Sequence, residues 1–387
     1  MKKLLLIGAG HAHAEVLRQF GEHPAANAAI TLVSLQRQFP YAGMFPGLVA
    51  GHYTHAQCHI DLVPVAARAG IEFVVGRINA IDADKRIAST AGGRDFEFDF
   101  ASIDVGSMPL VPDIPGLRQF ALLARPAGLF LEGWERVIDI ARDGGISKFS
   151  VVGGDVAAVE LMLAMVHRLA RELPPERFDA CGFSIVTGGA RLIDSQPEGL
   201  GRAVEEQCAA RGVSILRGAA VIAVERDAVR LSNGARLASD ITVWAAGAQP
   251  GPWLNASGLP CDENGFLKVD ESLRSTGSRR IYAAGSCTVP ATRAGLERTE
   301  PAHADAIDAR RALQQGPVLA ANLRQALAGE PPQHWLPTPG QLAMISLGQR
   351  KALALRAGNL ITGPRWAFWR WKDWTDRRWM RRYRVAT

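Results

Sequence analysis

The chain has 387 residues, more than one hydrophobic core usually organises, so we expect two or three domains. Hydrophobic residues make up 48% and charged residues 21%, which is ordinary for a soluble α/β protein and excludes a disordered or fibrous chain. No apolar run reaches the roughly 18 to 20 residues that a membrane-spanning helix needs. The net charge of +6 equals the excess in the tail, where residues 365–384 hold eight Lys or Arg against two Asp.

The first residues predict a unit of strand, helix and strand. Residues 4–7 (LLLI) form a short apolar run that stops at a glycine, as a buried parallel strand does. Residues 12–20 favour a helix and residues 29–34 a second strand. Around residue 148 the pattern recurs, with FSVV before Gly153, then a helix and a further strand. The chain therefore carries two copies of one mononucleotide-binding design.

The two copies align residue by residue, since GAGHAHAE (8–15) matches GGDVAAVE (153–160), with glycine first and glutamate last. Three further strands end in small residues: SIDVGSMP (102–109), ITVWAAGAQP (241–250) and RRIYAAGSC (279–287). We therefore predict an α/β fold with two Rossmann-like dinucleotide-binding domains. After Pro331 the composition turns to Pro, Trp and Arg, which indicates a separate C-terminal segment.

The turn at Gly8 and Gly10 predicts a dinucleotide site. The first glycine permits a tight turn, and the second lets the main chain approach a pyrophosphate at the N-terminal end of the following helix. A G-x-G alone is weak evidence, but this one follows a strand and precedes a helix. His13 replaces the third glycine, and Ser34 replaces the acidic residue that usually binds the ribose. His13 either spaces the helix from the sheet and donates to a phosphate oxygen, or is an ordinary surface or packed histidine.

In the second turn, Asp155 occupies the place where glycine would let the main chain meet a pyrophosphate. At about 4 Å, two like charges cost on the order of 1 kcal/mol in water and about 4 kcal/mol at an effective dielectric of about 20. That cost is enough to weaken the binding of NAD(P)H. Asp is also a favoured helix N-cap, so the turn can persist as a scaffold without a ligand. NAD(P)H binding is left open on these grounds.

These residues resemble a known family. The paired nucleotide folds, the turn at Gly8 and the strand endings at Gly106, Gly247 and Gly285 are similar to the pyridine nucleotide-disulfide oxidoreductase superfamily. Within it, residues 41–62 (YAGMFPGLVAGHYTHAQCHIDL) and 310–323 (RRALQQGPVLAANL) resemble the branch that holds type II NADH:quinone oxidoreductases, sulfide:quinone reductases and the flavoprotein domain fused to selenide, water dikinase. The last group is the most similar, and the resemblance covers nearly the whole chain. It is specific for fold and FAD, and only loosely for substrate.

The resemblance implies that the N-terminal turn holds the FAD pyrophosphate and that residues 283–286 (AAGS) contact the ribityl chain. Ser286 replaces the usual Asp and binds a hydroxyl less strongly because it is neutral. Residues 43–47 would pass near the isoalloxazine ring, or serve only as a rigid loop. The cofactor-binding candidates are Gly8, Gly10, His11, His13, Ser34, Arg37, Gly43, Met44, Pro46, Gly106, Gly153, Asp155, Gly247, Gly285 and Ser286. No metal ligand is expected.

The resemblance also implies an acceptor site. Quinone-reducing relatives carry A-Q-x-A-x-Q on the helix after the second FAD motif. Here Ala309, Ala312 and Gln314 match, while Arg310 replaces the first Gln. Gln314 and Gln315 are therefore candidates to contact a quinone. Glu160 matches an acidic residue that lies near the flavin in those relatives, with a solvated helix glutamate as the alternative.

The cysteines do not support a redox disulfide. Disulfide reductases of this superfamily use two close cysteines beside the flavin, and the corresponding region here holds only Cys58. Five scattered cysteines without a close pair favour a reducing, cytoplasmic setting. All five are expected to be buried, small apolar residues: Cys58, Cys181, Cys208, Cys261 and Cys287.

The tail, residues 364–384, interleaves five tryptophans with arginines. In a helix, Trp371, Trp374 and Arg378 share one side, which predicts a helix lying on a membrane surface with its guanidinium groups at anionic lipid. A dimer interface or packing within the chain is the alternative. Nucleic-acid binding is not expected, because no recognised module accompanies the charge.

Together these features predict a discontinuous FAD-binding domain (1–110 and 253–330), an inserted NAD(P)-type domain (111–252) and a C-terminal segment (331–387). The predicted function is to pass electrons from NAD(P)H through FAD to a quinone-type acceptor, at the inner face of the cytoplasmic membrane. One alternative is a flavin enzyme that has abandoned NAD(P)H and oxidises a small sulfur- or selenium-containing substrate. Another is a non-catalytic flavin-binding sensor or partner protein. The donor, the acceptor, the choice between NADH and NADPH, and a homodimer stay open.

Overall fold

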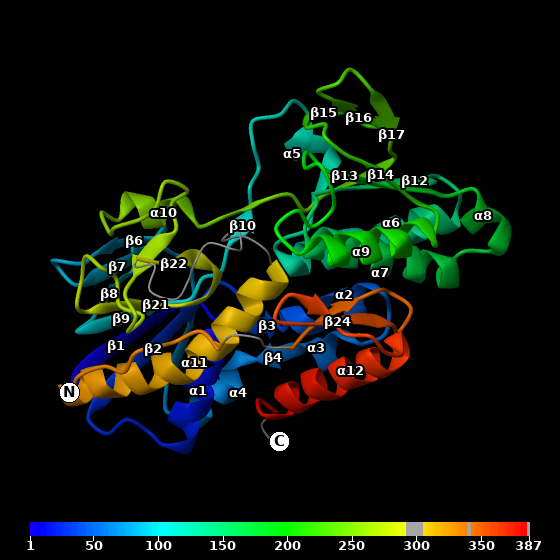
Figure 1. Ribbon diagram of the computed structural model, residues 1–387. Coiled ribbons are helices and arrows are strands. Elements are labelled where there is room, and N and C mark those ends of the chain that lie inside the picture. Colours follow the sequence, from blue (N-terminus) through cyan, green and yellow to red (C-terminus); the bar gives the residue numbers. More distant parts are fainter. Residues whose placement is uncertain (292–304, 339–341, 385–387) are drawn as a thin grey trace.

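The computed structural model describes residues 1–291, 305–338 and 342–384, with side chains of the long helix α11 from Arg310 onward. Two α/β units lie side by side, and the C-terminal helix α12 (red in Figure 1) runs beneath the junction between them. Each unit is built on a parallel five-stranded sheet. The mixed α/β fold with two Rossmann-like sheets was predicted from the sequence and is confirmed.

The first sheet has the order β21-β9-β1-β2-β5, and every neighbouring pair is parallel. Its central strand β1 is buried from its third residue onward, which explains the uninterrupted apolar run LLLI. Helices α1 and α11 pack against each other beside this sheet, and Gly316 permits the close approach because a Cβ there would lie 2.8 Å from the Glu15 Cβ. The strands are β1 (Lys2–Ile7), β2 (Ala28–Ser34), β5 (Glu72–Val75), β9 (Phe100–Ile103) and β21 (Ile281–Ala283), and the helices are α1 (His11–Glu22), α4 (Leu62–Arg68) and α11 (Asp305–Ala328).

The second sheet has the order β11-β18-β12-β13-β14, again with parallel neighbours, and its last four strands match β9-β1-β2-β5; its edge strand β11 comes first in the chain, whereas β21 comes last. Helix α7 follows β12 as α1 follows β1, and most of its side chains are buried in the unit's core. The strands are β11 (Ala121–Leu123), β12 (Lys148–Val152), β13 (Gly182–Val186), β14 (Val213–Leu216) and β18 (Ile241–Trp244). The helices are α5 (Leu117–Phe120), α6 (Ala127–Arg142), α7 (Val156–Glu172), α8 (Pro175–Asp179) and α9 (Glu198–Ala209).

Each unit also carries a three-stranded antiparallel sheet, which lies in the chain between β5 and β9 in the first unit and between β14 and β18 in the second. These sheets are β6 (Ile78–Asp82), β7 (Ile87–Thr90) and β8 (Asp95–Glu97) in the first unit, and β15 (Val221–Val224), β16 (Ala228–Leu231) and β17 (Arg236–Ala238) in the second. The repeat detected in the eight-residue turns therefore extends to four parallel strands and the antiparallel sheet of each unit.

The C-terminal residues form a hairpin and a helix that pack on both units. The sheet β23 (Leu342–Ser346), β24 (Ala352–Arg356) and β25 (Asn359–Leu360) contributes apolar side chains to the core around α7. Helix α12 (Arg365–Arg381) then contacts β24, β23 and the turn η1 (Ala42–Met44). The prediction of a separate C-terminal piece does not describe this packing.

Short elements connect the units. They are β3 (Gln38–Pro40), α2 (Phe45–Val49), α3 (His55–Cys58), β4 (His59–Asp61), β10 (Met108–Pro109), β19 (Ala248–Gln249), α10 (Pro252–Ala256), β20 (Leu267–Val269), η2 (Gly285–Cys287) and β22 (Thr288–Pro290). Helix α2 packs against α7, so the loop predicted to pass near the flavin ring also belongs to the second unit's core.

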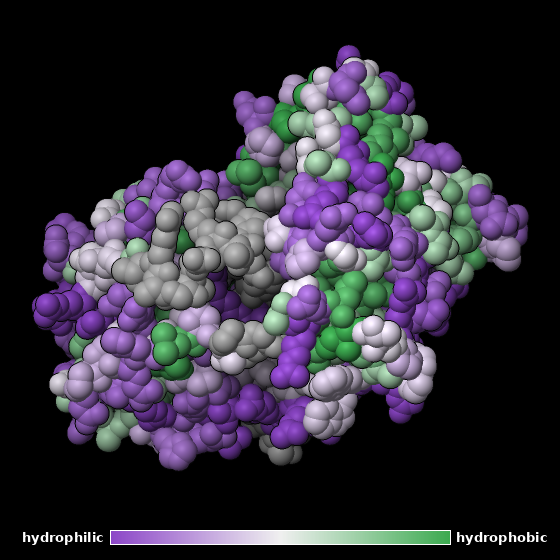
Figure 2. Space-filling view, in the orientation of Figure 1, coloured by the Kyte–Doolittle hydropathy of each residue, from purple (hydrophilic) through white to green (hydrophobic). Residues whose placement is uncertain are grey.

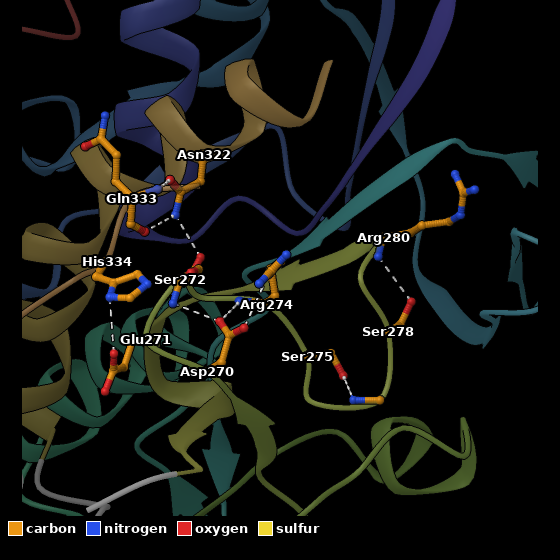
Figure 3. A network of polar contacts seen from close by, with 11 residues as sticks. Asp270, Glu271, Ser272, Arg274, Ser275, Ser278, Arg280, Asn322, Gln333 and His334 are labelled. Carbon is orange, nitrogen blue, oxygen red and sulfur yellow. Dashed lines mark hydrogen bonds and ion pairs between the residues drawn. The ribbon is translucent and has the colours of Figure 1, made fainter. Parts of the chain in front are cut away.

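A polar network holds the end of α11 against the turn that follows β20 (Figure 3). Asn322 donates to the carbonyls of Ser272 (2.8 Å) and Gln333 (3.0 Å), and its own carbonyl accepts from the Gln333 N–H. Asp270 organises the turn by accepting from the N–H groups of Ser272 and Arg274. Because these groups satisfy one another away from water, they fix α11, whose other end reaches the candidate site.

We propose to keep the domain division at 1–110 with 253–330, and 111–252, since the strands of the two parallel sheets fall within those ranges. Figure 2 shows a mostly hydrophilic surface, with apolar residues gathered near the middle of this face, over the region of α2 and β24, and on the second unit. Among the described residues, no helix combines the length and the apolar character that a bilayer crossing requires.

Candidate active site

A cavity of about 1040 Å³ opens between the two units at the carboxyl ends of both parallel sheets. This edge is where open α/β sheets bind ligands, and the volume lies at the upper end of the range for small-molecule sites. Ten cofactor-binding candidates and Glu160 line it: Gly8, Gly10, His11, Ser34, Gly43, Pro46, Gly106, Gly247, Gly285, Ser286 and Glu160. The second unit contributes Ala124, Arg125, Ala157, Leu161 and Ala245.

The N-terminal turn presents bare main chain to this cavity. Gly8 has φ +82, a conformation that favours glycine. Gly10 is the N-cap of α1 and has no side-chain cap of its own. A Cβ on Gly10 would lie 2.1 Å from the Asp104 Oδ1, so no other residue fits here without moving Asp104. The turn has the form that a diphosphate-binding loop requires.

His13 takes a role that differs from the predicted phosphate contact. Its ring is fully buried, and its Nδ1 donates to the Gly8 carbonyl at 2.6 Å. Burial lowers the pKa of His13, so the ring is neutral, and Nε2 accepts from the Ser102 hydroxyl at 2.8 Å. Both ring nitrogens are used inside the protein, and His13 holds the Gly8 turn from behind.

In the second turn, the side chain that caps the helix belongs to the turn itself. Asp155 is the N-cap of α7, and its Oδ1 accepts from the Ala158 N–H at 2.9 Å. Neither Asp155 nor Gly153 lines the cavity, although Ala157 does. Burial raises the pKa of Asp155, while the backbone bond and the charge of Arg125 oppose that rise. The capping alternative weighed for Asp155 is what the structure shows.

An aromatic cluster surrounds His11 at the start of α1. Phe39, Tyr41 and Trp379 lie with ring centroids 4.7, 5.6 and 6.0 Å from the His11 ring. The His11 Nε2 accepts from the Ala42 N–H, and burial lowers the pKa of His11 to about 4. His11 therefore stays neutral and joins α1 to the loop around η1.

Buried charged residues of α12 reach the opposite wall of the cavity. Lys372 donates to the Gly43 carbonyl and forms an ion pair of 2.6 Å with Asp376, whose other oxygen accepts from the Tyr41 hydroxyl at 3.0 Å. Burial alone would lower the pKa of Lys372, but the charges of Asp376 and Glu160 raise it. Trp371 and Thr375 complete this wall.

Glu160 lies on α7 at the same cavity. It is 6% exposed, and its Oε1 accepts from the Ser346 N–H at 2.6 Å. Burial raises the pKa of Glu160 to about 7, although Lys372 and the backbone bond oppose the rise. The alternative of a solvated glutamate is therefore wrong. A carboxyl that titrates near neutrality in a cavity is suited to proton transfer.

Some predicted residues lie away from the cavity. Met44 is buried in the first unit's core beside the cavity-lining Phe45, and Arg37 is exposed and paired with Asp61 at 3.2 Å. The Gln315 Oε1 accepts from the Gly285 N–H, and the Gln314 Oε1 accepts from the Thr338 N–H. Neither glutamine lines the cavity.

The cavity residues of α11 are instead Arg310, Ala312 and Leu313. Sequence reasoning also missed Asp104, Tyr41, Lys372 and Asp376. Only Asp104 left a signal, as a polar residue at the end of an apolar strand.

The cysteines take no part in the site. Cys58, Cys208 and Cys287 are buried as predicted, whereas Cys181 and Cys261 are half-buried, so that prediction was wrong for these two. Burial raises the pKa of both the Cys58 and the Cys287 thiol to about 12. Thiols are unreactive at such values.

The outer face of α12 forms an arginine-tryptophan groove of about 780 Å³. Its residues are Gln57, Arg350, Trp366, Trp369, Arg370, Asp373, Trp374, Arg377, Met380, Arg381 and Arg384. Asp373 is paired with Arg377 at 2.8 Å. The groove therefore carries a strong positive charge.

Comparison with known proteins identifies the family. The sequence profile of the pyridine nucleotide-disulphide oxidoreductases matches residues 2–306. The chain belongs to this family. Members of this family bind FAD and NADH.

The chain is 29% identical over 245 residues to an NADH dehydrogenase-like protein of Mycobacterium tuberculosis, over 59% of this chain. The match spans only 58% of that relative's length. It is 23% identical to the demethylphylloquinone reductase of a Synechocystis species, over 87% of this chain and 81% of the relative. The sulfide:quinone oxidoreductase of Aquifex aeolicus has the same fold, with a TM-score of 0.81, 18% identity, and coverage of 99% of this chain and 92% of that one.

The residues fit FAD at the first turn, where Gly10 lacks the Cβ that would fill the approach and the cavity continues from this turn to Gly285 and Ser286. The fit of a nicotinamide dinucleotide at the second turn is poorer, because Asp155 stands in the turn itself as the N-cap of α7, and neither it nor Gly153 lines the cavity.

Proposed function

We propose that this protein is an FAD-dependent oxidoreductase that passes two electrons from NAD(P)H to a quinone-type acceptor at a membrane surface. One observation carries the proposal: a single cavity joins the N-terminal glycine turn, the strand ends of the second unit and the buried pair Glu160 and Lys372. The named functions of the mycobacterial and cyanobacterial relatives support it. Bound FAD would accept the electron pair from the donor and deliver it to the acceptor.

The protein's own residues would position the ring and manage protons. Gly8 and Gly10 would hold the diphosphate, while the loop carrying Gly43 and Pro46 would face the ring from the side of α12. Reduction of a quinone to a quinol consumes two electrons and two protons. Glu160 can hold one proton on its carboxyl near neutral pH, and the second would come from solvent. Although burial opposes it, the charge of Asp376 raises the pKa of Lys372, so its Nζ stays charged and would stabilise negative charge on the acceptor.

A donor other than NAD(P)H is the second candidate, because Asp155 caps α7 from within the second turn. A carboxylate there opposes a pyrophosphate by electrostatic repulsion. A small reduced substrate, such as a sulfur or selenium compound, would reach the cavity without using that turn.

Anaerobic titration with NADH and NADPH tests the donor. Bleaching of the flavin absorbance, followed by recovery of colour when a soluble ubiquinone or menaquinone analogue is added, is the expected result. Colour that persists with both nucleotides would remove NAD(P)H as the donor and leave the second candidate. Colour that does not return with any quinone would remove the proposed acceptor.

The membrane part of the proposal depends on the arginine-tryptophan groove. Among the described residues, no ion pair is formed by Arg350, Arg370, Arg381 or Arg384. Trp366 and Trp374 are 59% and 51% exposed. Arginine and tryptophan together favour the headgroup region of an anionic bilayer. The other side of the same helix lines the cavity, so an acceptor could pass from the lipid to the site along α12.

A further inference from the structure

Asp104, directly after β9, connects the parts of the flavin site in a way that no motif assigns. Its side chain is 2% exposed, and its Oδ2 accepts from the His13 N–H at 2.9 Å. Its carboxylate is also bonded by the Ala12 N–H. Its main-chain carbonyl accepts from the Gly10 N–H at 3.0 Å. A residue from a neighbouring strand thus caps α1, in place of a capping side chain at Gly10.

Three glycines that the sequence assigned to the flavin pack around this residue. A Cβ on Gly10 would lie 2.1 Å from the Asp104 Oδ1, and one on Gly285 would lie 2.6 Å from the same atom. A Cβ on Gly8 would lie 2.6 Å from the Asp104 carbonyl oxygen. Glycine is therefore required at these positions by Asp104 as well as by the approach of a ligand. The residue joins the N-terminal turn to the turn at η2.

The carboxyl of Asp104 lies where a diphosphate would be bound. Asp104 lines the same cavity as Gly8 and Gly10, and the diphosphate of a dinucleotide lies at the helix N-terminus after such a turn. Two anionic groups at close range repel each other, and the repulsion is strong where water is excluded. Either the phosphate binds weakly, or the carboxyl becomes neutral when it binds.

Burial makes this carboxyl easier to protonate than an exposed aspartate. Burial raises the pKa of Asp104, although His13 and the backbone N–H groups of α1 oppose the rise. On α1, burial lowers the pKa of both His11 and His13, so neither carries a positive charge at neutral pH. In η2, the Cys287 thiol is protonated because burial raises its pKa to about 12, although the positive charge of Arg311 on α11 opposes that rise.

We propose that Asp104 is a positioning residue of the flavin site, and that its carboxyl takes up one proton from solvent when the diphosphate of FAD binds beside it. The proposal rests on the proposed binding of FAD at the first turn. In the balanced step, an ionised carboxylate and a free FAD become a protonated carboxyl and a bound FAD, with one proton consumed. The affinity for FAD therefore falls as pH rises above the pKa of Asp104, by up to about tenfold for each pH unit.

The test is the dissociation constant of FAD from the apoprotein, measured by quenching of flavin fluorescence between about pH 6 and 9. The wild-type protein should lose affinity by at least about tenfold across this range. Asp104→Asn keeps the acceptor oxygen for the N–H groups but carries no charge, so its affinity should vary by less than about threefold and exceed that of the wild type at the highest pH.

Asp155→Asn is the matched control, because it makes the same change in the cap of the second unit. This variant should keep the wild-type pH dependence. Equal pH dependence in Asp104→Asn and the wild type would overturn the proposal and would point to another group at the turn, such as His11. Absence of FAD binding at every pH would instead contradict the proposed function.

A second measurement uses only the wild-type protein. Titration calorimetry of the wild-type apoprotein with FAD, in buffers that differ in ionisation enthalpy, reports the number of protons exchanged. The expected result at about pH 8 is an uptake that approaches one proton per FAD. No uptake, or release of protons, would overturn the proposal.

Discussion

Four strands follow the same order in the two α/β units, but the carboxylate that caps the helix after the glycine turn, α1 or α7, comes from a different place in each. In the first unit, Gly10 stands at the N-cap and Asp104 reaches α1 from β9, so the turn itself stays bare. In the second unit, Asp155 stands at the N-cap and bonds Ala158 from within the turn. One backbone design thus keeps both of its glycines when the capping carboxylate comes from a neighbouring strand, and loses the second glycine when the carboxylate belongs to the turn itself.

The largest effect is expected at Gly10. In Gly10→Ala, the new Cβ would overlap Asp104, so either the carboxyl moves or the turn opens. We expect FAD affinity to fall by at least about a hundredfold, which is the loss of about 2.7 kcal/mol. The measurement is flavin content after purification together with the dissociation constant of added FAD.

Gly199→Ala is the control for that change, because Gly199 lies in α9 with no atom within 4 Å of a new Cβ. It should leave FAD binding unchanged and slightly stabilise the helix. Normal FAD affinity in Gly10→Ala would show that the bare turn is not the binding element.

Glu15 and Glu160 end the two matched segments, and both side chains are buried. Their pKa values are shifted in opposite directions. Although burial opposes it, bonds from Arg18, Gln19 and Tyr383 lower the pKa of Glu15. Burial raises the pKa of Glu160 to about 7. Glu160→Gln should slow quinone reduction by on the order of a hundredfold and leave reduction of the flavin by its donor intact.

The pH profile separates a proton donor from a structural residue. Wild-type quinone reduction should decline as pH rises through about 7, where Glu160 loses its proton, and Glu160→Gln should lack this decline. Glu15→Gln should keep the activity and its pH profile and lose about 1 to 3 kcal/mol of stability. The stability that Glu15 contributes is present above its ordinary pKa and is lost as pH falls through its lowered pKa. An unchanged profile in Glu160→Gln would remove Glu160 as the proton donor.

Asp155→Gly would remove the capping carboxylate of α7 and leave only main chain in the second turn. We expect the dissociation constant for NADH to fall by about five- to tenfold, since about 1 kcal/mol of repulsion is removed. The same change should lower the free energy of unfolding by about 1 kcal/mol, because α7 loses its N-cap. Spectroscopic titration with NADH and thermal denaturation measure the two effects. If NADH affinity does not rise, repulsion by Asp155 is not what limits nucleotide binding.

A separate prediction concerns the two faces of α12. Removal of residues 364–387 cannot test membrane binding alone, because Lys372 and Asp376 on that helix line the cavity. Arg381→Glu with Arg384→Glu changes only the groove. Binding to vesicles of anionic lipid should weaken by at least about thirtyfold, because two arginines are lost at about 1 kcal/mol each.

Arg136→Glu with Arg226→Glu makes the same change of net charge on exposed sites of the second unit and should bind vesicles as the wild type does. Equal vesicle binding by the two double variants would show that the groove is not the membrane contact.

Much of the fold was predictable because its signals are local. The apolar run before Gly8, the repeat at Gly153 and the small residues after Ile103 each follow from strand and turn geometry within a few positions. The same reasoning found most of the glycine-rich cavity wall, and Asp155 as a helix cap.

The site residues that were not predicted depend on contacts between segments that are far apart in the chain. Lys372 meets Gly43, and Tyr41 meets Asp376, across more than 300 positions. Neither pair carries a periodic or motif signal. The tail was expected to face lipid, and one side of it instead completes the cavity. Gln314 and Gln315 were assigned from a partial motif, and their amides bond to main chain, while Arg310 and Leu313 line the cavity.

The most direct measurement is reconstitution of the apoprotein with FAD, followed by gel filtration and an absorbance spectrum. A bare turn at Gly8 and Gly10 predicts a yellow protein that retains one FAD per chain, and a colourless product from Gly10→Ala. A wild-type chain that emerges folded but colourless after incubation with excess FAD would contradict the assignment of this turn.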